Sequence, residues 1–123
     1  GSYPLETMPY YLSVTDCLLI TLKKDKVFSN TLPAKLQPYL SSGKPILGNL
    51  SGEGLNIIQK NSLGLGCNPG NPAKLAKLAI EMSLLGKDKI LEIEKNCHKL
   101  NTNTFSKDKI FKTLISEINN FKK

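Results

Sequence analysis

Two short segments of the sequence carry residues suited to binding an anionic group. The first contains Thr31, Pro33 and Lys35, and the second is Gly52-Glu53-Gly54. Each opens a predicted helix, whose first N–H groups lack acceptors and carry partial positive charge. Thr31 adds a hydroxyl, Lys35 adds a positive charge, and the glycines allow close approach of the backbone to a ligand. Two such helix starts side by side would form an anion site, for which phosphate is the usual ligand.

The same residues also have a purely structural explanation. Every α/β domain has helices that begin beside strand ends, and proline and glycine often mark those boundaries. The stretch Thr31–Gly54 contains neither G-x-x-x-x-G-K-[ST] nor G-x-G-x-x-G, which are the usual phosphate-loop patterns. The single histidine, His98, falls on the polar side of a lysine-rich helix and is expected at the surface. No catalytic residue and no metal ligand can be assigned from the sequence.

The elements that must position these residues follow an α/β pattern. Three short apolar runs, Cys17–Leu22, Pro45–Leu50 and Leu63–Cys67, predict strands of a mostly parallel sheet. The first run is nearly continuous, so we expect that strand to be covered on both faces. Glu6–Leu12 predicts a short helix before it, and Lys23–Asn30 is typical of a loop.

Two helices are predicted between the strands. One begins at Pro33 and ends at Gly43, with Lys35 in its first turn. The other follows Ser51 as its N-cap, with Glu53 in the first turn. The carboxyl ends of parallel strands and the starts of the following helices share one edge of a sheet, where ligands of open α/β domains bind.

The remainder of the chain is predicted to be helical. Asn71 caps a helix that Gly86 stops, Asp88 caps a second, and Ser106 caps a third, while Asn101–Thr104 serves as a linker. The last helix has an apolar face that needs a partner, either the sheet or a second chain. That face consists of Ile110, Phe111, Leu114, Ile115, Ile118 and Phe121.

The composition restricts the class of partner. The net charge is +7 and every basic residue is lysine. Since specific nucleic-acid sites favour arginine, we expect no nucleic-acid partner and attribute the charge to attraction of phosphorylated small molecules or an acidic membrane surface. Cys17, Cys67 and Cys97 are widely spaced and are expected to be small apolar residues of a reducing compartment. No apolar run reaches the length of a membrane span.

Three blocks of sequence together resemble a known family. They are Asp16-Cys17-Leu18-Leu19-Ile20 after a helix, Pro33–Leu40 followed by Gly43-Lys44-Pro45-Ile46, and Gly52-Glu53-Gly54 followed by Gly64–Asn71. These blocks are similar to the C-terminal lobe of bacterial family 4 glycosyltransferases of the GT-B fold. The most similar branch adds amino sugars, such as L-fucosamine, during surface-polysaccharide synthesis.

The resemblance implies a truncated Rossmann-like lobe that binds a nucleotide sugar, UDP- or GDP-linked, as substrate without a separate cofactor. Thr31, Leu32, Pro33 and Lys35 would line the diphosphate side. Gly52, Glu53 and Gly54 would lie close to the sugar and phosphates. The parent enzyme would transfer the sugar to a polysaccharide or lipid-linked acceptor held by a separate N-terminal lobe. Such an enzyme is expected in the cytoplasm, free or at the inner face of the membrane.

The sequence departs from the family in two ways. Many members carry two glutamates with seven residues between them, and the second holds the ribose; the corresponding positions here are Asn30 and Pro38, with Gln37 as the candidate substitute. The chain also lacks further strands before Tyr3. We therefore expect residues 1–2 to be a tag remnant, residues 3–104 a partial nucleotide-sugar lobe that is inactive alone, and residues 105–123 a helix packed on the lobe or on a partner.

Two other classes of protein are weighed against this interpretation. Thr21 and Lys44-Pro45 resemble parts of a phosphoacceptor receiver domain, but the acidic residues of a receiver are missing, since Asp16 precedes its strand. A lysine-rich, non-catalytic module that binds nucleic acid or a membrane surface is the second alternative. It predicts binding to any polyanion with steep salt dependence and no preference for nucleotides.

Overall fold

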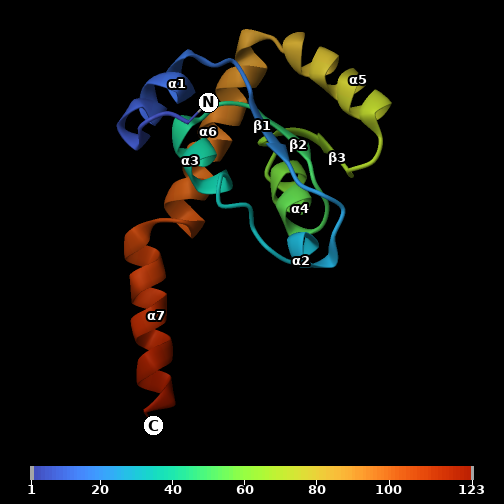
Figure 1. The fold of residues 1–123 in the computed structure, drawn as a ribbon. Coiled ribbons are helices and arrows are strands. Elements are labelled where there is room, and N and C mark those ends of the chain that lie inside the picture. The colour runs from blue at the N-terminus through green and yellow to red at the C-terminus, as the bar shows by residue number, and fades with distance from the viewer. Residues whose placement is uncertain (1, 123) are drawn as a thin grey trace.

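Three short strands form a parallel sheet at the centre of the computed structural model, which describes residues 2–122 (Figure 1). The strands are β1 (Leu18–Thr21), β2 (Ile46–Asn49) and β3 (Gly64–Cys67), and they lie in chain order. Their register aligns Ile20 with Gly48 and Gly48 with Gly66. The predicted α/β class, with a Rossmann-like parallel sheet, flanking helices and a C-terminal helical tail, is confirmed.

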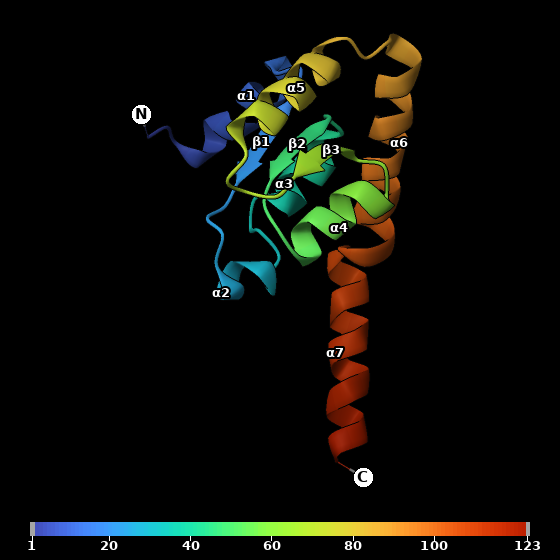
Figure 2. The same cartoon turned by 90° about the vertical axis from the view of Figure 1, so that its right-hand side faces the viewer.

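Helices cover both faces of the sheet (Figure 2). The helical elements are the 3-10 turn η1 (Leu5–Thr7), α1 (Met8–Val14), α2 (Lys26–Ser29), α3 (Leu36–Ser42), α4 (Glu53–Lys60), α5 (Pro72–Ser83), α6 (Lys87–Thr104) and α7 (Lys107–Phe121). Helices α3, α4 and α6 pack on one face, and α5 packs on the other face over β2 and β3. The domain therefore has three layers, and α7 is outside them.

The main hydrophobic core lies between the sheet and α3, α4 and α6. Its buried residues are Ile20, Leu36, Leu40, Ile46, Leu50, Leu55, Ile58, Leu63, Ile93 and Cys97. A smaller cluster on the other face consists of Leu47, Cys67, Leu78 and Met82. Two of the three cysteines are thus core residues, as expected. Each fully buried aliphatic side chain contributes roughly 1.5–3 kcal/mol to folding.

The prediction that β1 is covered on both faces is wrong. Leu18 and Ile20 are buried, but Leu19 on the other face is 48% exposed and Thr21 is also exposed. Helix α5 lies over β2 and β3 and does not reach over β1. The apolar run of β1 therefore does not mean that both faces of the strand are covered. Whether the second face is covered depends on where α5 crosses the sheet.

Several predicted boundaries also differ in the structure. The segment Lys23–Asn30 is not only a loop, since Asp25 accepts a hydrogen bond from the Val27 N–H at 2.8 Å and caps α2. Helix α5 ends at Ser83, and Gly86 is the N-cap of α6, so Asp88 lies in the first turn of α6 and is not its cap. The predicted caps Asn71 and Ser106 are confirmed, because each side chain accepts a backbone N–H in the first turn of its helix.

The predicted linker Asn101–Thr104 is helical. It forms the last turn of α6, whose C-cap is Phe105. The Asn101 side chain donates to the Ser41 hydroxyl oxygen at 3.1 Å and thereby connects α6 to α3. The break between the two C-terminal helices comes later, at Phe105-Ser106, where Ser106 caps α7.

Helix α7 extends away from the domain in both views (Figures 1 and 2). All its described side chains are exposed, so it does not pack on the sheet of its own chain. Two residues of the predicted segments lie outside the described residues. They are Gly1, in the predicted tag remnant, and Lys123, at the end of the predicted last helix. None of the helices in the described part of the chain is both long enough and apolar enough to span a membrane.

Candidate functional site

The two predicted anion-binding segments meet at the edge of the sheet where the strands end, which we call the carboxyl edge. The connection from α2 to α3 runs along the start of α4. A Cβ on Gly52 would collide with the Ser29 carbonyl oxygen, and a Cβ on Gly54 would lie 3.1 Å from the Pro33 ring. Gly54 is buried at this contact. The structure therefore brings Pro33 together with Gly54, and the backbone of Ser29 together with Gly52.

Helix α4 begins without a side-chain cap. Its N-cap is Gly52, with φ +73° and ψ −142°, and not Ser51 as predicted. The Ser51 hydroxyl is paired with the Ser29 hydroxyl at 3.0 Å. The first N–H donor within this helix is that of Asn56, which donates to the Gly52 carbonyl at 3.1 Å.

The N–H groups of Glu53, Gly54 and Leu55 therefore have no acceptor within α4. These groups and the helix dipole concentrate partial positive charge at the start of α4. A cap by Ser51 would have neutralised part of this potential. The pairing of Ser51 with Ser29 instead leaves the helix start without a side-chain cap.

Helix α3 begins three residues later than predicted. Its first residue is Leu36, and Lys35 is the N-cap and not part of the first turn. Pro33 begins a turn in which its carbonyl accepts the Leu36 N–H at 2.9 Å. The reason is Pro38: a helix starting at Pro33 would need an N–H at position 38 and would bring that ring against the Ala34 carbonyl. With Leu36 as the first residue, Pro38 lies in the first turn, where no N–H is needed.

The remaining predicted site residues are exposed, on the same connection or, for Glu53, in the first turn of α4. Thr31 donates its hydroxyl to the Phe28 carbonyl at 3.4 Å, and Leu32 is exposed. Lys35 and Glu53 are also exposed, and neither ion pair found within residues 2–122 involves Lys35. The ammonium group of Lys35 is therefore available to an anion.

Additional positive charge at this edge was missed in the sequence interpretation. Lys23, Lys24 and Lys26 follow the carboxyl end of β1 and lie at the surface. The only acidic residue among them, Asp25, uses its carboxylate to cap α2. The sequence pattern that could have indicated this charge is Lys-Lys-Asp-Lys, directly after a strand. Its three lysines favour an anionic ligand by electrostatic attraction.

Gln37, the candidate substitute for the ribose-binding glutamate, is used elsewhere. Its amide nitrogen donates to the Phe105 carbonyl at 3.4 Å, at the end of α6. Asn30 is the C-cap of α2 and is exposed at the carboxyl edge. The Gln37 assignment stays a prediction, although this contact holds the side chain at the α6–α7 junction.

Two of the three thiols are poor nucleophiles, and the single histidine lies at the surface. Burial raises the pKa of Cys97 to about 11 and also raises the pKa of Cys17, so both thiols stay protonated near neutral pH. His98 is half-exposed on α6 and lies 3.8 Å from the Glu94 carboxylate, which confirms its surface position. Within residues 2–122, no three His, Cys, Asp or Glu side chains lie close enough together to hold a metal ion.

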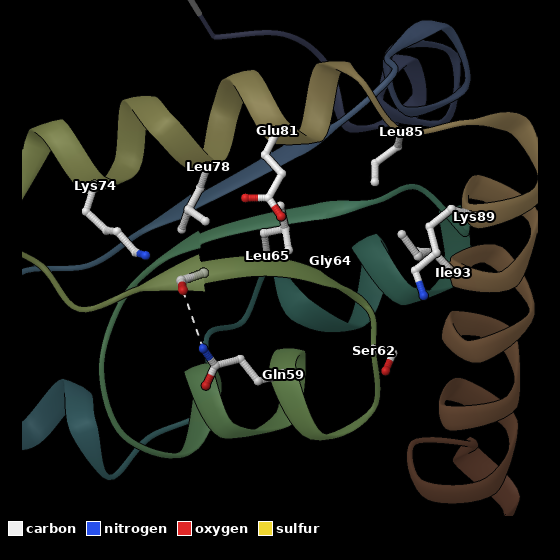
Figure 3. Close-up of a pocket in the computed structure, with 11 residues that line it drawn as sticks. Gln59, Ser62, Gly64, Leu65, Lys74, Leu78, Glu81, Leu85, Lys89 and Ile93 are labelled. Carbon is white, nitrogen blue, oxygen red and sulfur yellow. Dashed lines mark hydrogen bonds between the residues drawn. The ribbon is translucent and has the colours of Figure 1, made fainter.

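A separate hollow of about 630 Å³ lies beside β3, between α4, α5 and α6 (Figure 3). Its floor is apolar and includes Leu65 and Leu78, and its rim carries Lys74, Glu81 and Lys89. The Lys89 ammonium is paired with the Glu92 carboxylate at 2.9 Å. None of the predicted site residues lines this hollow. It arises because β3 is an edge strand that leaves a gap between α5 and α6, an arrangement that local sequence patterns do not encode.

The carboxyl edge is the better candidate for a functional site. Ligands of open α/β sheets bind outside the carboxyl ends of the strands, where uncapped helix starts and glycines gather. The hollow beside β3 has charged groups of both signs around an apolar floor. Comparisons with protein-family models, with curated proteins and with solved structures find no match to this chain.

Proposed function

We propose that this chain is the donor-binding part of a glycosyltransferase, which holds the diphosphate of a nucleotide sugar at the carboxyl edge. The observation that carries the proposal is the contact of the Ser29–Pro33 connection with the uncapped start of α4, at Gly52 and Gly54. A diphosphate needs several N–H donors and nearby positive charge, and the proposal assigns the donors to the uncapped start of α4 and the charge to the exposed Lys35.

Each predicted site residue then has a role in donor binding. The N–H groups of Glu53 and Gly54 donate to phosphate oxygens, and Lys35 contributes a point charge. Thr31 and Leu32 line the same connection, and Pro33 packs against Gly54 and fixes its distance from α4. Glu53, whose side chain is exposed in the first turn of α4, is proposed to accept hydrogen bonds from sugar hydroxyls.

The proposed chemistry is electrostatic. When a sugar leaves a nucleotide diphosphate, negative charge develops on the departing phosphate, and preorganised N–H donors stabilise that charge in the transition state. Lys23, Lys24 and Lys26, which follow β1, add to the positive electrostatic potential at this edge. The acceptor and the group that activates it are proposed to be supplied by a separate lobe of the parent enzyme, for transfer to a polysaccharide or lipid-linked acceptor.

An NMR titration of the isotope-labelled chain tests the proposal. UDP, GDP and inorganic pyrophosphate are added separately at moderate salt. We expect saturable shifts of the amides of residues 29–32, 34–35 and 52–55, with one nucleotide binding at least several-fold more tightly than pyrophosphate. Equal weak shifts with all three ligands would support the alternative of a generic anion-binding module. If no amide at the carboxyl edge shifts, the assignment of this site is wrong.

A further inference from the structure

Helix α7 presents an apolar face that nothing in the described part of its own chain covers. The exposed fractions of its six large apolar side chains range from 47% at Ile118 to 89% at Phe121. These side chains are Ile110, Phe111, Leu114, Ile115, Ile118 and Phe121. They recur at helical spacing along one side of α7, which is typical of a helix that packs against another helix.

The direction of α7 is set by its junction with α6. Ser106 accepts the Lys109 N–H at 3.3 Å and caps α7, and the Lys109 ammonium donates to the Asn103 carbonyl at 2.8 Å. The Gln37 amide donates to the Phe105 carbonyl from α3. The junction is therefore held by these polar contacts and by Phe105, which packs against the main core. Most of the apolar face of α7 lies beyond the junction.

The junction also contains a concave apolar surface, which we call the elbow hollow. It has a volume of about 540 Å³ and is lined by Asn103, Thr104, Lys109, Ile110, Thr113, Leu114 and Glu117. Ile110 and Leu114 are part of both the hollow and the apolar face of α7. The hollow therefore continues that face toward the domain.

We propose that α7 pairs antiparallel with α7 of a second copy of this chain. If the pairing is centred between Leu114 and Ile115, Phe121 of one copy lies opposite Asp108 of the other, because a helix rises 1.5 Å per residue. This places the most exposed aromatic ring of the chain beside the elbow hollow of the other copy. By the same arithmetic Lys122 of one copy lies opposite Lys107 of the other and next to Asp108, so the ends of the pair place charges of both signs together.

The antiparallel direction follows from the shape and charge of the chain. Because α7 extends away from the domain, antiparallel pairing places the two domains at opposite ends of the helix pair (Figure 1). A parallel pair would bring both domains to the same end, where two chains of net charge +7 repel each other. Antiparallel helix dipoles also attract.

The area of the face is sufficient for specific association of modest affinity. Six side chains that are about half exposed offer roughly 80–100 Å² each, which gives about 1,000 Å² per pair, the lower limit for a specific interface. We therefore expect a dimer that dissociates on dilution and not a permanent one.

Sedimentation of the full chain over a 100-fold range of concentration tests the pairing. We expect the mass to rise from that of one chain toward that of two. Ile115→Glu places a charge in the face and should weaken association at least tenfold. Ser116→Glu adds the same charge on the opposite side of α7 and should leave association unchanged. Because both positions are exposed, neither variant disturbs the core.

Cross-linking tests the direction of the helices. Chains with Asp108→Cys are mixed with chains with Lys122→Cys, and Cys17→Ser is introduced in both because that native thiol is only half-buried. Antiparallel pairing predicts mixed disulfide dimers in excess of those formed by either variant alone. A strictly monomeric chain, association that Ile115→Glu leaves unchanged, or cross-links mainly between two Asp108→Cys chains would each overturn the proposal.

Discussion

Gly52 lies directly against Ser29, so that any side chain at position 52 would collide with the Ser29 carbonyl oxygen. The φ of Gly52 is +73°, a value that residues with a side chain rarely adopt. The two residues belong to consecutive crossover connections of the sheet, and their contact fixes how closely the α2–α3 connection approaches α4. The hydroxyl pair between Ser29 and Ser51 reinforces the same contact at 3.0 Å.

Gly52→Ala tests that contact through its effect on stability. The added Cβ must displace backbone, and the residue must adopt a strained conformation, so we expect a loss of at least ~2 kcal/mol in the free energy of unfolding by urea. Gly86→Ala is the matched control, since Gly86 has φ −73° and no atom within 4 Å of the place that an added Cβ would take. The control should cost less than about 1 kcal/mol. Equal losses in both variants would contradict the role of the contact.

Lys35→Ala tests the electrostatic part of the proposed site. Removal of one exposed charge should weaken nucleotide binding about three- to tenfold at low salt, with the effect decreasing as salt is added. Calorimetric titration gives the dissociation constants. Lys77→Ala removes an exposed lysine from α5 and gives the same net charge as the Lys35 variant. If Lys77→Ala weakens nucleotide binding as much as Lys35→Ala does, the loss of affinity comes from the lower total charge and not from a contact at the proposed site.

Leu40→Ala tests the core that supports the α3 side of this edge. Leu40 is fully buried, and the substitution should cost about 2–5 kcal/mol in the free energy of unfolding because it leaves a cavity. Leu84 is 78% exposed, so Leu84→Ala should change stability by only about 0.5 kcal/mol. A small effect at Leu40 would mean that α3 is not packed as described.

The fold class could be predicted from the sequence because the strands and most helices have strong local signals. Asn71 and Ser106 each precede an apolar helical pattern directly, and both are caps in the structure. The start of α3 lies three residues after the predicted one, because Pro38 is compatible with a helix from Leu36 and not with one from Pro33. Ser51 is not a cap because its hydroxyl pairs with Ser29, 22 residues away in the chain.

The positions of the proposed site residues depend on contacts that local patterns do not contain. The sequence indicates Gly52 and Gly54 as points of close approach to a ligand, whereas the structure shows parts of the same chain, Ser29 and Pro33, against them. The contact of Gln37 with Phe105 could not be predicted for the same reason, because the two residues are 68 positions apart. The hollow beside β3 depends on how α5 and α6 cross the sheet edge and has no sequence signal.

The Cys97 thiol predicts a pH dependence of stability. Burial raises its pKa from the ordinary 9.0 to about 11 in the folded chain. Between these values the unfolded chain loses the proton and the folded chain keeps it, so the unfolded state binds fewer protons and stability falls as pH rises. The slope from this group is about 1.4 kcal/mol per pH unit in that window, and its contribution is fully present below pH 9.

Cys97→Val isolates this contribution because it removes the titrating group and keeps an apolar side chain of similar size. Urea unfolding at pH values from about 8 to about 11 should show a steeper loss of stability in the parent chain than in the variant once the pH exceeds the ordinary thiol pKa. At lower pH the difference between the two should be constant. Parallel curves over the whole range would mean that the thiol ionises as readily in the folded chain as in the unfolded one, which would contradict its burial in the core between α6 and the sheet.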